Sequence, residues 1–322
     1  MYDVIILGSG PAGYTAALYT SRAFLKTLVL VGVAPGGQLT TTTQVDNYPG
    51  FAGGIKGPAL MMEMKKQAER FGTEIIGKDC TRLSFPRRRE SRDGSPIGSG
   101  MTEHAGPFTA VAGDETYEGK SVIVATGAQA MYLGLPSEQK LMGKGVSACA
   151  TCDGFFFRGK EVVVIGGGDT AMEEATFLTK FATKVTIIHR RDEFRASAIM
   201  LDRAKKDPKI SFLTNKIVEE ILGDTVVTGI RLKDSKTGQL DEVKTQGVFL
   251  AIGHKPSTEF LKGVVELDEK GYVVVKETAT SVPGIFAAGD CVDHRYRQAI
   301  VAAGQGCMAA MDAEKWLSEH DR

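Results

Sequence analysis

The chain has 322 residues, of which 43% are hydrophobic. That length and hydrophobic content are sufficient to bury the cores of two ordinary domains. Its 39 lysine and arginine residues balance its 39 aspartate and glutamate residues, which excludes a global positive field for nucleic acid and an acidic disordered tail. No uninterrupted apolar run is long enough for a signal peptide or a membrane span, so we expect a cytoplasmic protein.

The N-terminal segment has the pattern of a strand, a glycine loop and a helix. An apolar run from Tyr2 to Leu7 leads into the sequence GSGPAG, and an alanine-rich stretch runs from Tyr14 to Phe24. In such a unit the glycines allow a tight turn, close approach of the backbone to a pyrophosphate, and close packing of the helix on the strand. We therefore expect a dinucleotide at the start of the helix, where free N–H groups face its phosphates. The alternative is a glycine-rich turn without a ligand.

The next predicted strand, Thr27 to Val31, lacks the acidic residue that usually binds the adenosine ribose. The strand end reads Leu30-Val31-Gly32 and carries no carboxylate. In the common fingerprint an aspartate or glutamate at this point accepts hydrogen bonds from the ribose hydroxyls. Recognition of the ribose must therefore come from elsewhere in the chain or from backbone groups.

Residues 85–105, FPRRRESRDGSPIGSGMTEHA, differ in composition from the rest of the first half. They follow a predicted helix, Lys56 to Phe71, and a predicted strand, Thr73 to Ile76. They have almost no apolar periodicity and cannot contribute to a core, so we predict a surface insertion. The alternative is a docking patch built on four close arginines, Arg87, Arg88, Arg89 and Arg92.

The second half of the chain repeats the architecture of the first. Apolar strands end in Thr126-Gly127 and, far downstream, in Ile252-Gly253, and each closes a half that opens with a glycine loop. The second loop follows a predicted strand, Glu161 to Ile165, and opens a helix with Ala171, Ala175 and Leu178 on one face. We expect a second nucleotide on this loop, at Gly166, Gly168, Asp169, Thr170 and Ala171.

A basic cluster follows the next predicted strand, Lys184 to Ile188. The sequence continues His189-Arg190-Arg191, with Arg195 one turn further on. Guanidinium groups suit a 2′-phosphate, whereas an unphosphorylated ribose is usually met by a carboxylate. We therefore expect NADPH on the second loop. The alternative is a solvent-exposed basic turn.

The C-terminal segment has no glycine loop of its own. A predicted strand, Gly284 to Ala288, leads to Gly289-Asp290, and a helix of small residues follows Gln298 and continues through Trp316. The Asp290 carboxylate at the strand end can bind the hydroxyls of a sugar alcohol chain. The segment most simply returns to complete the first domain, which makes the middle of the chain an inserted domain.

A Cys-x-x-Cys pair, Cys149 and Cys152, precedes the second glycine loop and is followed by Asp153. The other three cysteines are scattered singly, so a disulfide framework is excluded and no second ligand pair stands at zinc spacing. A zinc pair and a buried inert pair remain as alternatives to a redox dithiol. In the redox interpretation Asp153 serves as acid and base to the departing thiol.

NADPH delivers two electrons as a hydride, and a disulfide accepts two electrons with protons. A flavin between the two is the usual route, because direct hydride transfer to sulfur is not. The first nucleotide is therefore predicted to be FAD. Electrons would pass from NADPH to the flavin, from the flavin to a Cys149–Cys152 disulfide, and then by exchange to an external disulfide.

The chain resembles the low-molecular-weight bacterial thioredoxin reductases along nearly all of its length. The resemblance rests on GSGPAGYTAALY at 8–19, GGQLTTTT at 36–43, GVSACATCDGFFFR at 145–158, GGGDTAMEEA at 166–175, HRRDEFRA at 189–196, AIGHKP at 251–256 and AAGD at 287–290. It implies an α/β fold with two Rossmann-like domains, thioredoxin as the protein substrate, and a homodimer. The compact pattern of the family lacks the insertion at 85–105.

The motifs and the resemblance together divide the chain and assign its site residues. They imply an FAD domain at 1–130 and 256–322, split around an NADPH and dithiol domain at 131–255. The residues expected at FAD are Gly8, Ser9, Gly10, Pro11, Ala12, Gly37, Gln38, Leu39, Asn47, Thr126, Gly127, Asp290, Gln298 and Ala299. Those expected at NADPH are Gly166, Gly168, Asp169, Thr170, Ala171, His189, Arg190, Arg191 and Arg195. The expected catalytic residues are Cys149, Cys152 and Asp153, and no metal is expected.

Several alternative functions share this scaffold. The flavoprotein subunit of a hydroperoxide reductase carries an added N-terminal thioredoxin-like region, whereas the flavin loop here starts at Gly8. A ferredoxin–NADP oxidoreductase lacks the cysteine pair. A reductase of another small disulfide protein, and a flavin-loaded redox sensor that uses the dithiol without turnover, would both keep that pair.

The connectivity predicts an enzyme with a moving domain. The dithiol and the nicotinamide site belong to one inserted domain, and both must meet one flavin. They should therefore take turns, with the inserted domain pivoting about two connections near residues 127–133 and 253–257.

Overall fold

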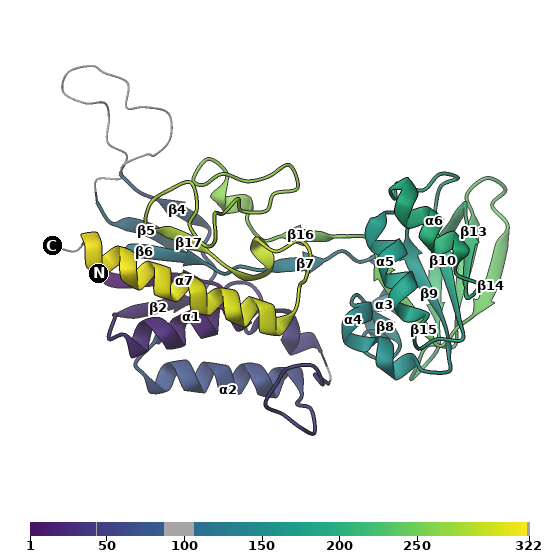
Figure 1. Ribbon diagram of the computed structural model, residues 1–322, viewed down its shortest axis with the longest axis horizontal. Helices are drawn as coiled ribbons and strands as arrows, with labels where there is room; N and C mark the ends of the chain where they lie inside the picture. The colour runs from purple at the N-terminus through teal and green to yellow at the C-terminus, as the bar shows by residue number, and fades with distance from the viewer. Residues whose placement is uncertain (43, 87–105, 321–322) are drawn as a thin grey trace, which may run out of the picture. The chain divides into compact units, whose positions relative to one another are not determined.

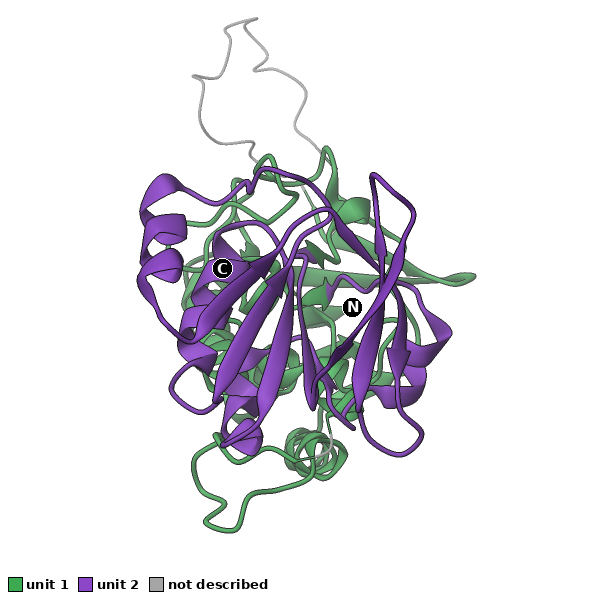
Figure 2. Cartoon of the chain, turned by 90° about the vertical axis from the view of Figure 1, so that its right-hand side faces the viewer, with its two compact units in different colours: residues 1–129, 255–322 green, residues 130–254 purple. Residues whose placement is uncertain are grey.

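The structure is a computed structural model that describes residues 1–42, 44–86 and 106–320 (Figure 1). The chain forms two compact units: unit 1 comprises residues 1–129 and 255–322, and unit 2 comprises residues 130–254 (Figure 2). The insertion predicted at 85–105 lies outside the described residues except for Phe85 and Pro86, and so does the patch predicted at Arg87, Arg88, Arg89 and Arg92.

Unit 1 is built on a seven-stranded sheet in the order β3-β2-β1-β6-β5-β4, with β17 also paired to β6. Strands β1, β2, β3, β6 and β17 are parallel, while β5 and β4 are added in antiparallel fashion. The elements, with 3-10 helices marked η, are β1 (Tyr2–Leu7), α1 (Pro11–Arg22), β2 (Thr27–Leu30), η1 (Gly37–Thr41), α2 (Gly57–Arg70), β3 (Glu74–Ile76), β4 (Arg82–Ser84), β5 (Phe108–Ala112), β6 (Glu115–Val124), η3 (Glu259–Leu261), β17 (Ile285–Ala287), η4 (Gly289–Cys291) and α7 (Ala299–His320).

Helices α1, α2 and α7 lie together on one face of this sheet (Figure 1). Alternate residues of β1 face opposite sides, as the two-residue repeat of a strand requires. Val4 and Ile6 pack in the core under the helices, whereas Ile5 and Leu7 pack in a second core on the other face. The sheet is thus buried on both faces, which explains the continuous apolar run read at the N terminus.

Unit 2 contains a five-stranded parallel sheet in the order β11-β10-β9-β15-β8 and a three-stranded antiparallel sheet, β12-β13-β14. Its elements are α3 (Pro136–Leu141), β8 (Val146–Ser147), α4 (Ala150–Asp153), η2 (Gly154–Phe157), β9 (Glu161–Gly166), α5 (Asp169–Leu178), β10 (Lys184–Ile188), α6 (Ala198–Lys206), β11 (Ile210–Leu213), β12 (Lys216–Leu222), β13 (Gly229–Asp234), β14 (Leu240–Lys244) and β15 (Gly247–Ala251). Where the chain passes between the units, β7 (Ala128–Ala130) and β16 (His254–Pro256) pair as a two-stranded sheet.

The predicted fold class is confirmed. Each unit has a sheet with neighbouring parallel strands in which a strand, a glycine loop and a helix follow one another, at β1–α1 and at β9–α5. Ala171, Ala175 and Leu178, predicted on the packed face of the second helix, are all fully buried. Within the ranges that the structure describes, every helix is too short or too polar to cross a bilayer.

Candidate functional site

The loop between β1 and α1 has no room for a side chain at two of its glycines. A Cβ atom on Gly8 would lie 2.2 Å from the Ala125 carbonyl oxygen, and one on Gly13 would lie 2.0 Å from the Gly8 carbonyl oxygen. A Cβ atom on Gly10 would meet nothing within 4 Å. The first and third glycines therefore serve close packing, while Gly10 borders open space at the N terminus of α1, where free N–H groups favour a phosphate.

A second glycine segment lies against this loop. A Cβ atom on Gly37 would lie 3.2 Å from the Cα atom of Gly10. The Ser9 hydroxyl donates to the Val31 carbonyl at 2.8 Å and accepts a hydrogen bond from the Gly36 N–H group at 2.9 Å. These contacts bring the predicted residues Gly37, Gln38 and Leu39, on η1, to the same end of the sheet, and the Gln38 amide donates to the Ala128 carbonyl.

The C-terminal segment also lies beside the first glycine loop. A Cβ atom on Gly289 would lie 2.9 Å from that of Ala12, and one on Gly306 would lie 2.2 Å from the Ala12 carbonyl oxygen. Just before α7, the Asn47 amide donates to the Gln298 side-chain oxygen at 3.2 Å. Residues separated by more than 250 positions therefore meet beside the first glycine loop.

Thr126 and Gly127, the end of the central strand segment, border the same loop. A Cβ atom on Gly8 would lie 3.0 Å from the Thr126 Cα atom. The Thr126 hydroxyl is buried beside the Cys291 thiol, and burial raises the pKa of that thiol to about 11. Cys291 is therefore held as a neutral thiol in the core, and packing is its role in unit 1.

In unit 2 the loop between β9 and α5 repeats this geometry. A Cβ atom on Gly166 would lie 2.4 Å from the Ala251 carbonyl oxygen, whereas one on Gly168 would meet nothing within 4 Å. Ala171 takes the place of the third glycine and is fully buried. The Asp169 carboxylate accepts a hydrogen bond from the Ser197 N–H group at 2.6 Å, which fastens the start of α5 to the segment before α6. Thr170 lies in the first turn of α5.

The basic segment after β10 folds back over this second loop. The Arg195 and Ala196 N–H groups donate to the Gly167 carbonyl at 2.7 and 3.1 Å. The His189 ring is buried, stacks on the Phe194 ring at 5.0 Å, and shares a hydrogen bond with the Glu193 carbonyl. These contacts hold the predicted cations at the edge of the loop.

The guanidinium groups of this segment are exposed and available. Arg190, Arg191 and Arg195 are exposed, and none has an acidic partner among the described residues. Of the two acids in the segment, Asp192 is bound by Lys236 at 2.7 Å and by the Asn215 amide at 2.5 Å, and Glu193 is exposed. The local field is therefore positive where a 2′-phosphate is expected.

The two cysteines of the Cys-x-x-Cys motif are joined by a disulfide in unit 2. Cys149 caps the short helix α4, and its sulfur accepts a hydrogen bond from the Cys152 N–H group at 3.2 Å. Cys152 is exposed and Cys149 is half-buried. Among the described residues no cluster of three or more histidine, cysteine or acidic side chains forms a metal site. The pair is a disulfide that solvent can reach.

Asp153 follows the disulfide and is half-buried. Burial raises the pKa of its carboxyl group, and a hydrogen bond with Ser147 partly lowers it. The Ser147 hydroxyl also accepts a hydrogen bond from the Cys149 N–H group at 3.0 Å. An acid with a raised pKa beside a disulfide can keep a proton for a departing thiolate. Sequence reasoning missed Ser147, whose only signal was its position two residues before the motif.

The comparisons with known proteins decide the family. A model of the family described as pyridine nucleotide-disulphide oxidoreductase matches residues 2–306. The chain belongs to this family. The match spans both glycine loops and the disulfide, so the oxidoreductase contains the two nucleotide-site patterns and the redox group on one chain.

This oxidoreductase is similar to three known proteins along nearly its whole length. A thioredoxin reductase from Mycolicibacterium smegmatis is 56% identical over 324 aligned residues, covering all of this chain and 98% of the relative. A glucosaminate ammonia-lyase from Pseudomonas fluorescens is 52% identical, covering 98% of this chain and 95% of the relative. The solved structure of a thioredoxin reductase from Giardia duodenalis has 45% identity and a TM-score of 0.89, covering 98% of this chain and 99% of the other.

Asp290, in η4 of the oxidoreductase, has a carboxyl group with a raised pKa. Burial and the nearby Asp293 carboxylate raise its pKa to about 6, against an opposing effect of Arg297. In the unfolded chain an aspartate loses its proton near pH 4. The protonated Asp290 carboxyl group therefore makes its full contribution to the free energy of unfolding below about pH 4. This contribution is lost as the pH rises through about 6.

We expect Asp290→Asn to remove this pH dependence. In protein freed of any bound nucleotide, the variant should gain up to about 3 kcal/mol of unfolding free energy over wild type between about pH 4 and about pH 8, because it has no carboxylate to ionise. Urea denaturation at the two pH values measures the difference, with the exposed Asp114→Asn as matched control. A gain for Asp290→Asn no larger than that of the control would contradict the assignment.

Proposed function

We propose that the chain is an NADPH-dependent thioredoxin-disulfide reductase that uses FAD. The observation that carries this proposal is the Cys149–Cys152 disulfide beside the half-buried Asp153, on a chain that also holds two open glycine loops. A disulfide exposed at its second sulfur suits exchange with a protein substrate. The names of the relatives from Mycolicibacterium smegmatis and Giardia duodenalis support thioredoxin as that substrate.

The residues of unit 1 fit FAD. Its phosphates would lie on the open side of Gly10, and the Asp290 carboxyl group, with its raised pKa, can exchange hydrogen bonds with the hydroxyls of the ribityl chain. The Gln38 amide donates to the Ala128 carbonyl, and the Asn47 amide donates to the Gln298 side-chain oxygen. When bound, FAD supplies the two-electron chemistry that links a hydride donor to a disulfide.

The residues of unit 2 fit NADPH on the loop at Gly168, with Arg190 and Arg191 on its 2′-phosphate. Reduction of the disulfide by two electrons yields two thiolates, and two protons are needed to form the dithiol. We assign one of these protons to Asp153, because its raised pKa keeps a larger protonated fraction than an exposed aspartate has. The dithiol then passes the electrons to the substrate disulfide by exchange.

An assay with purified components tests the proposal. The protein should be yellow, and NADPH with thioredoxin should reduce a reporter disulfide catalytically. Glucosaminate serves as the alternative substrate, since one relative is named for its deamination. Ammonia elimination from a sugar acid involves no net oxidation and gives no role to the disulfide. Colourless protein, or turnover of glucosaminate without disulfide reduction, would contradict the proposal.

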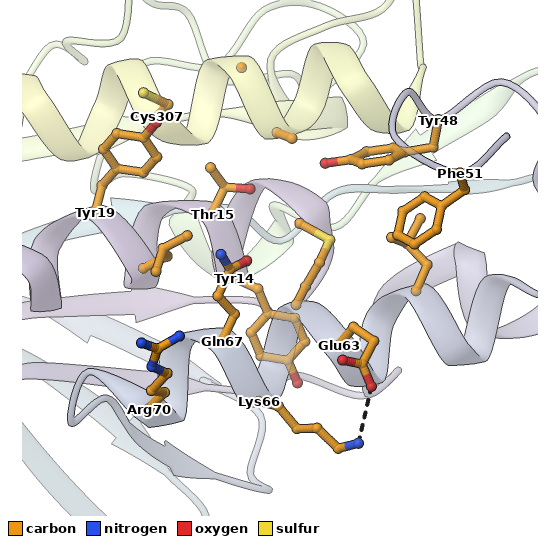
Figure 3. Close-up of a pocket in the computed structure, with 15 residues that line it drawn as sticks. Tyr14, Thr15, Tyr19, Tyr48, Phe51, Glu63, Lys66, Gln67, Arg70 and Cys307 are labelled. Atoms are coloured by element: carbon orange, nitrogen blue, oxygen red, sulfur yellow. Dashed lines mark hydrogen bonds and ion pairs between the residues drawn. The ribbon is translucent and has the colours of Figure 1, made fainter. Parts of the chain in front are cut away.

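We also propose a homodimer that forms through the helical face of unit 1. Helices α1, α2 and α7 and residues 48–51 surround a pocket of about 720 Å³, in which Tyr14 and Tyr19 come from α1 and Cys307 from α7 (Figure 3). Tyr19 of this lining is 41% exposed, and Met308 and Met311 of α7 are 48% and 60% exposed. Apolar patches of this kind mark protein interfaces. Light scattering measures the mass, and a monomer at micromolar concentration would exclude this assembly.

Movement of the inserted unit is the last part of the proposal. The chain crosses between the units twice, and Gly127 and Gly253 at these crossings have φ angles of 70° and 114°, which favour glycine. On the unit 2 side the buried Glu138 accepts the N–H groups of Leu133 and Gly134 at 2.8 and 2.9 Å, so the flexible part of the connection ends there. A cross-link that fixes one orientation should permit one half-reaction and stop multiple turnover. Unimpaired turnover in the cross-linked protein would exclude the movement.

A further inference from the structure

The end of β2 carries no acidic side chain. The strand is followed by Val31 and Gly32, and Gly32 has a φ angle of 87°, a conformation that favours glycine. In the common dinucleotide fingerprint this is the point at which a carboxylate meets the adenosine ribose. The sequence leaves open which group takes over that task.

The neighbouring strand continues alongside this point. Strands β2 and β3 are parallel, with Leu30 opposite Ile76. Beyond the strands, the Val31 N–H group donates to the Ile76 carbonyl at 3.0 Å, and the Gly32 N–H group donates to the Lys78 carbonyl at 3.0 Å. The segment after β3 is thereby held against the end of β2.

Asp79 lies in the space that a side chain on Gly32 would enter. A Cβ atom on Gly32 would lie 3.8 Å from the Asp79 Oδ1 atom, the one described atom within 4 Å of that position outside Gly32 and its two chain neighbours. The carboxylate of Asp79 thus stands at the carboxyl end of β2, although it is carried by the chain beyond β3. The acid missing from the fingerprint in sequence is present there in space.

The carboxylate of Asp79 has acceptor capacity to spare. It is half-buried, and burial raises its pKa, while a hydrogen bond from the Cys80 N–H group partly lowers it. The adjacent Lys78 ammonium pairs with Glu115 at 2.7 Å instead. Among the described residues no cation or side-chain donor is bound to Asp79. A half-buried carboxylate with a single backbone donor favours hydroxyl donors from a ligand.

The position also agrees with the first glycine loop. Ser9 of that loop donates to the Val31 carbonyl at 2.8 Å, so the phosphate site and the end of β2 are joined by one hydrogen bond. In a dinucleotide site of this class the adenosine ribose lies between the helix N terminus and the end of the second strand. Asp79 stands at the far end of that span.

We propose that Asp79 binds the hydroxyls of the adenosine ribose of FAD, in place of the acid that β2 lacks. The inference rests on the proposed use of FAD. It assigns recognition of the ribose to a residue outside both glycine loops. It also accounts for the missing acid of the fingerprint, because the carboxylate comes from the segment after β3 instead of from the end of β2.

The test measures FAD binding by the nucleotide-free protein, by quenching of flavin fluorescence. Wild type, Asp79→Ala and Asp79→Asn are compared with Asp114→Asn, an exposed aspartate of the same unit. Each is titrated with FAD and with an FAD analogue whose adenosine carries no 2′ or 3′ hydroxyl. Asp79→Ala should lower the affinity for FAD about ten- to hundredfold, because the ribose hydroxyls lose their hydrogen bonds to a charged carboxylate. Asp79→Asn, which keeps one acceptor, should lose less, and Asp114→Asn should match wild type.

The analogue separates a bond to the ribose from a general effect on folding. Wild type should bind the analogue about ten- to hundredfold more weakly than FAD, whereas Asp79→Ala should bind the two about equally. Undiminished discrimination between FAD and the analogue in Asp79→Ala would overturn the assignment of Asp79 while leaving the proposed function intact. Failure of wild type to bind FAD would overturn both.

Discussion

Replacing Cys152 with serine is expected to lower the rate of thioredoxin reduction at least about a thousandfold while leaving reduction of the flavin by NADPH within about twofold of wild type. Cys152 is the exposed half of the disulfide, and a serine oxygen can neither form that bond nor accept electrons through it. The sites proposed for NADPH and FAD do not include the sulfur of Cys152. The variant should therefore separate the two half-reactions.

Stopped-flow absorbance of the flavin measures the first half-reaction, and a thioredoxin-coupled reporter disulfide measures the second. Cys307→Ser is the matched control, since Cys307 is a half-exposed free thiol on α7 of unit 1. It should retain both activities. If Cys152→Ser still reduced thioredoxin at a substantial fraction of the wild-type rate, electrons would have to bypass the disulfide and the proposed pathway would be wrong.

Replacing both Arg190 and Arg191 with alanine is expected to lower kcat/KM for NADPH about a hundredfold and for NADH less than about threefold. The two guanidinium groups are exposed and have no acidic partners among the described residues, while Asp192 is held by Lys236 and Asn215. Charge-assisted hydrogen bonds to a 2′-phosphate would be lost, and NADH has no such phosphate.

Steady-state kinetics with both nucleotides measure the ratio of the two kcat/KM values. The double replacement of Arg203 and Lys205 by alanine is the control, because it removes two cations from α6 of the same unit. That control should keep the wild-type preference. Equal losses for NADPH and NADH in the Arg190 and Arg191 variant would show that these residues support folding or general charge instead of the 2′-phosphate.

The strand, glycine loop and helix units were open to prediction because their signals are local. The tight turn at Gly8, the open space beside Gly10 and the buried face at Ala171 follow from short-range sterics. The same holds for the strand Lys184–Ile188, which the structure reproduces residue for residue. Helix ends were less certain, since α1 begins at Pro11 and the expected helix began at Tyr14.

Other parts of the fold carried no comparable signal. The antiparallel strands β4 and β5 and the separate sheet β12-β13-β14 were not foreseen. Strands Arg82–Ser84 and Leu240–Lys244 are short and half-exposed, so their pairing depends on partners distant in sequence more than on their own apolar pattern. Ser147 was missed for the same reason: its bonds to Cys149 and Asp153 exist only once the chain has folded.

The sequence by itself determined the chemistry of this protein, because glycine loops, a Cys-x-x-Cys pair and an arginine cluster need only their own neighbours to be recognised. The tertiary structure alone decided which distant groups share a site. It brought Gln298 to Asn47 and Gly289 to Ala12, and it placed Asp79 at the end of a strand that has no acid. The physical reason is that parallel strands bring together residues far apart in the chain. A carboxylate that follows one strand can therefore lie at the end of the neighbouring strand.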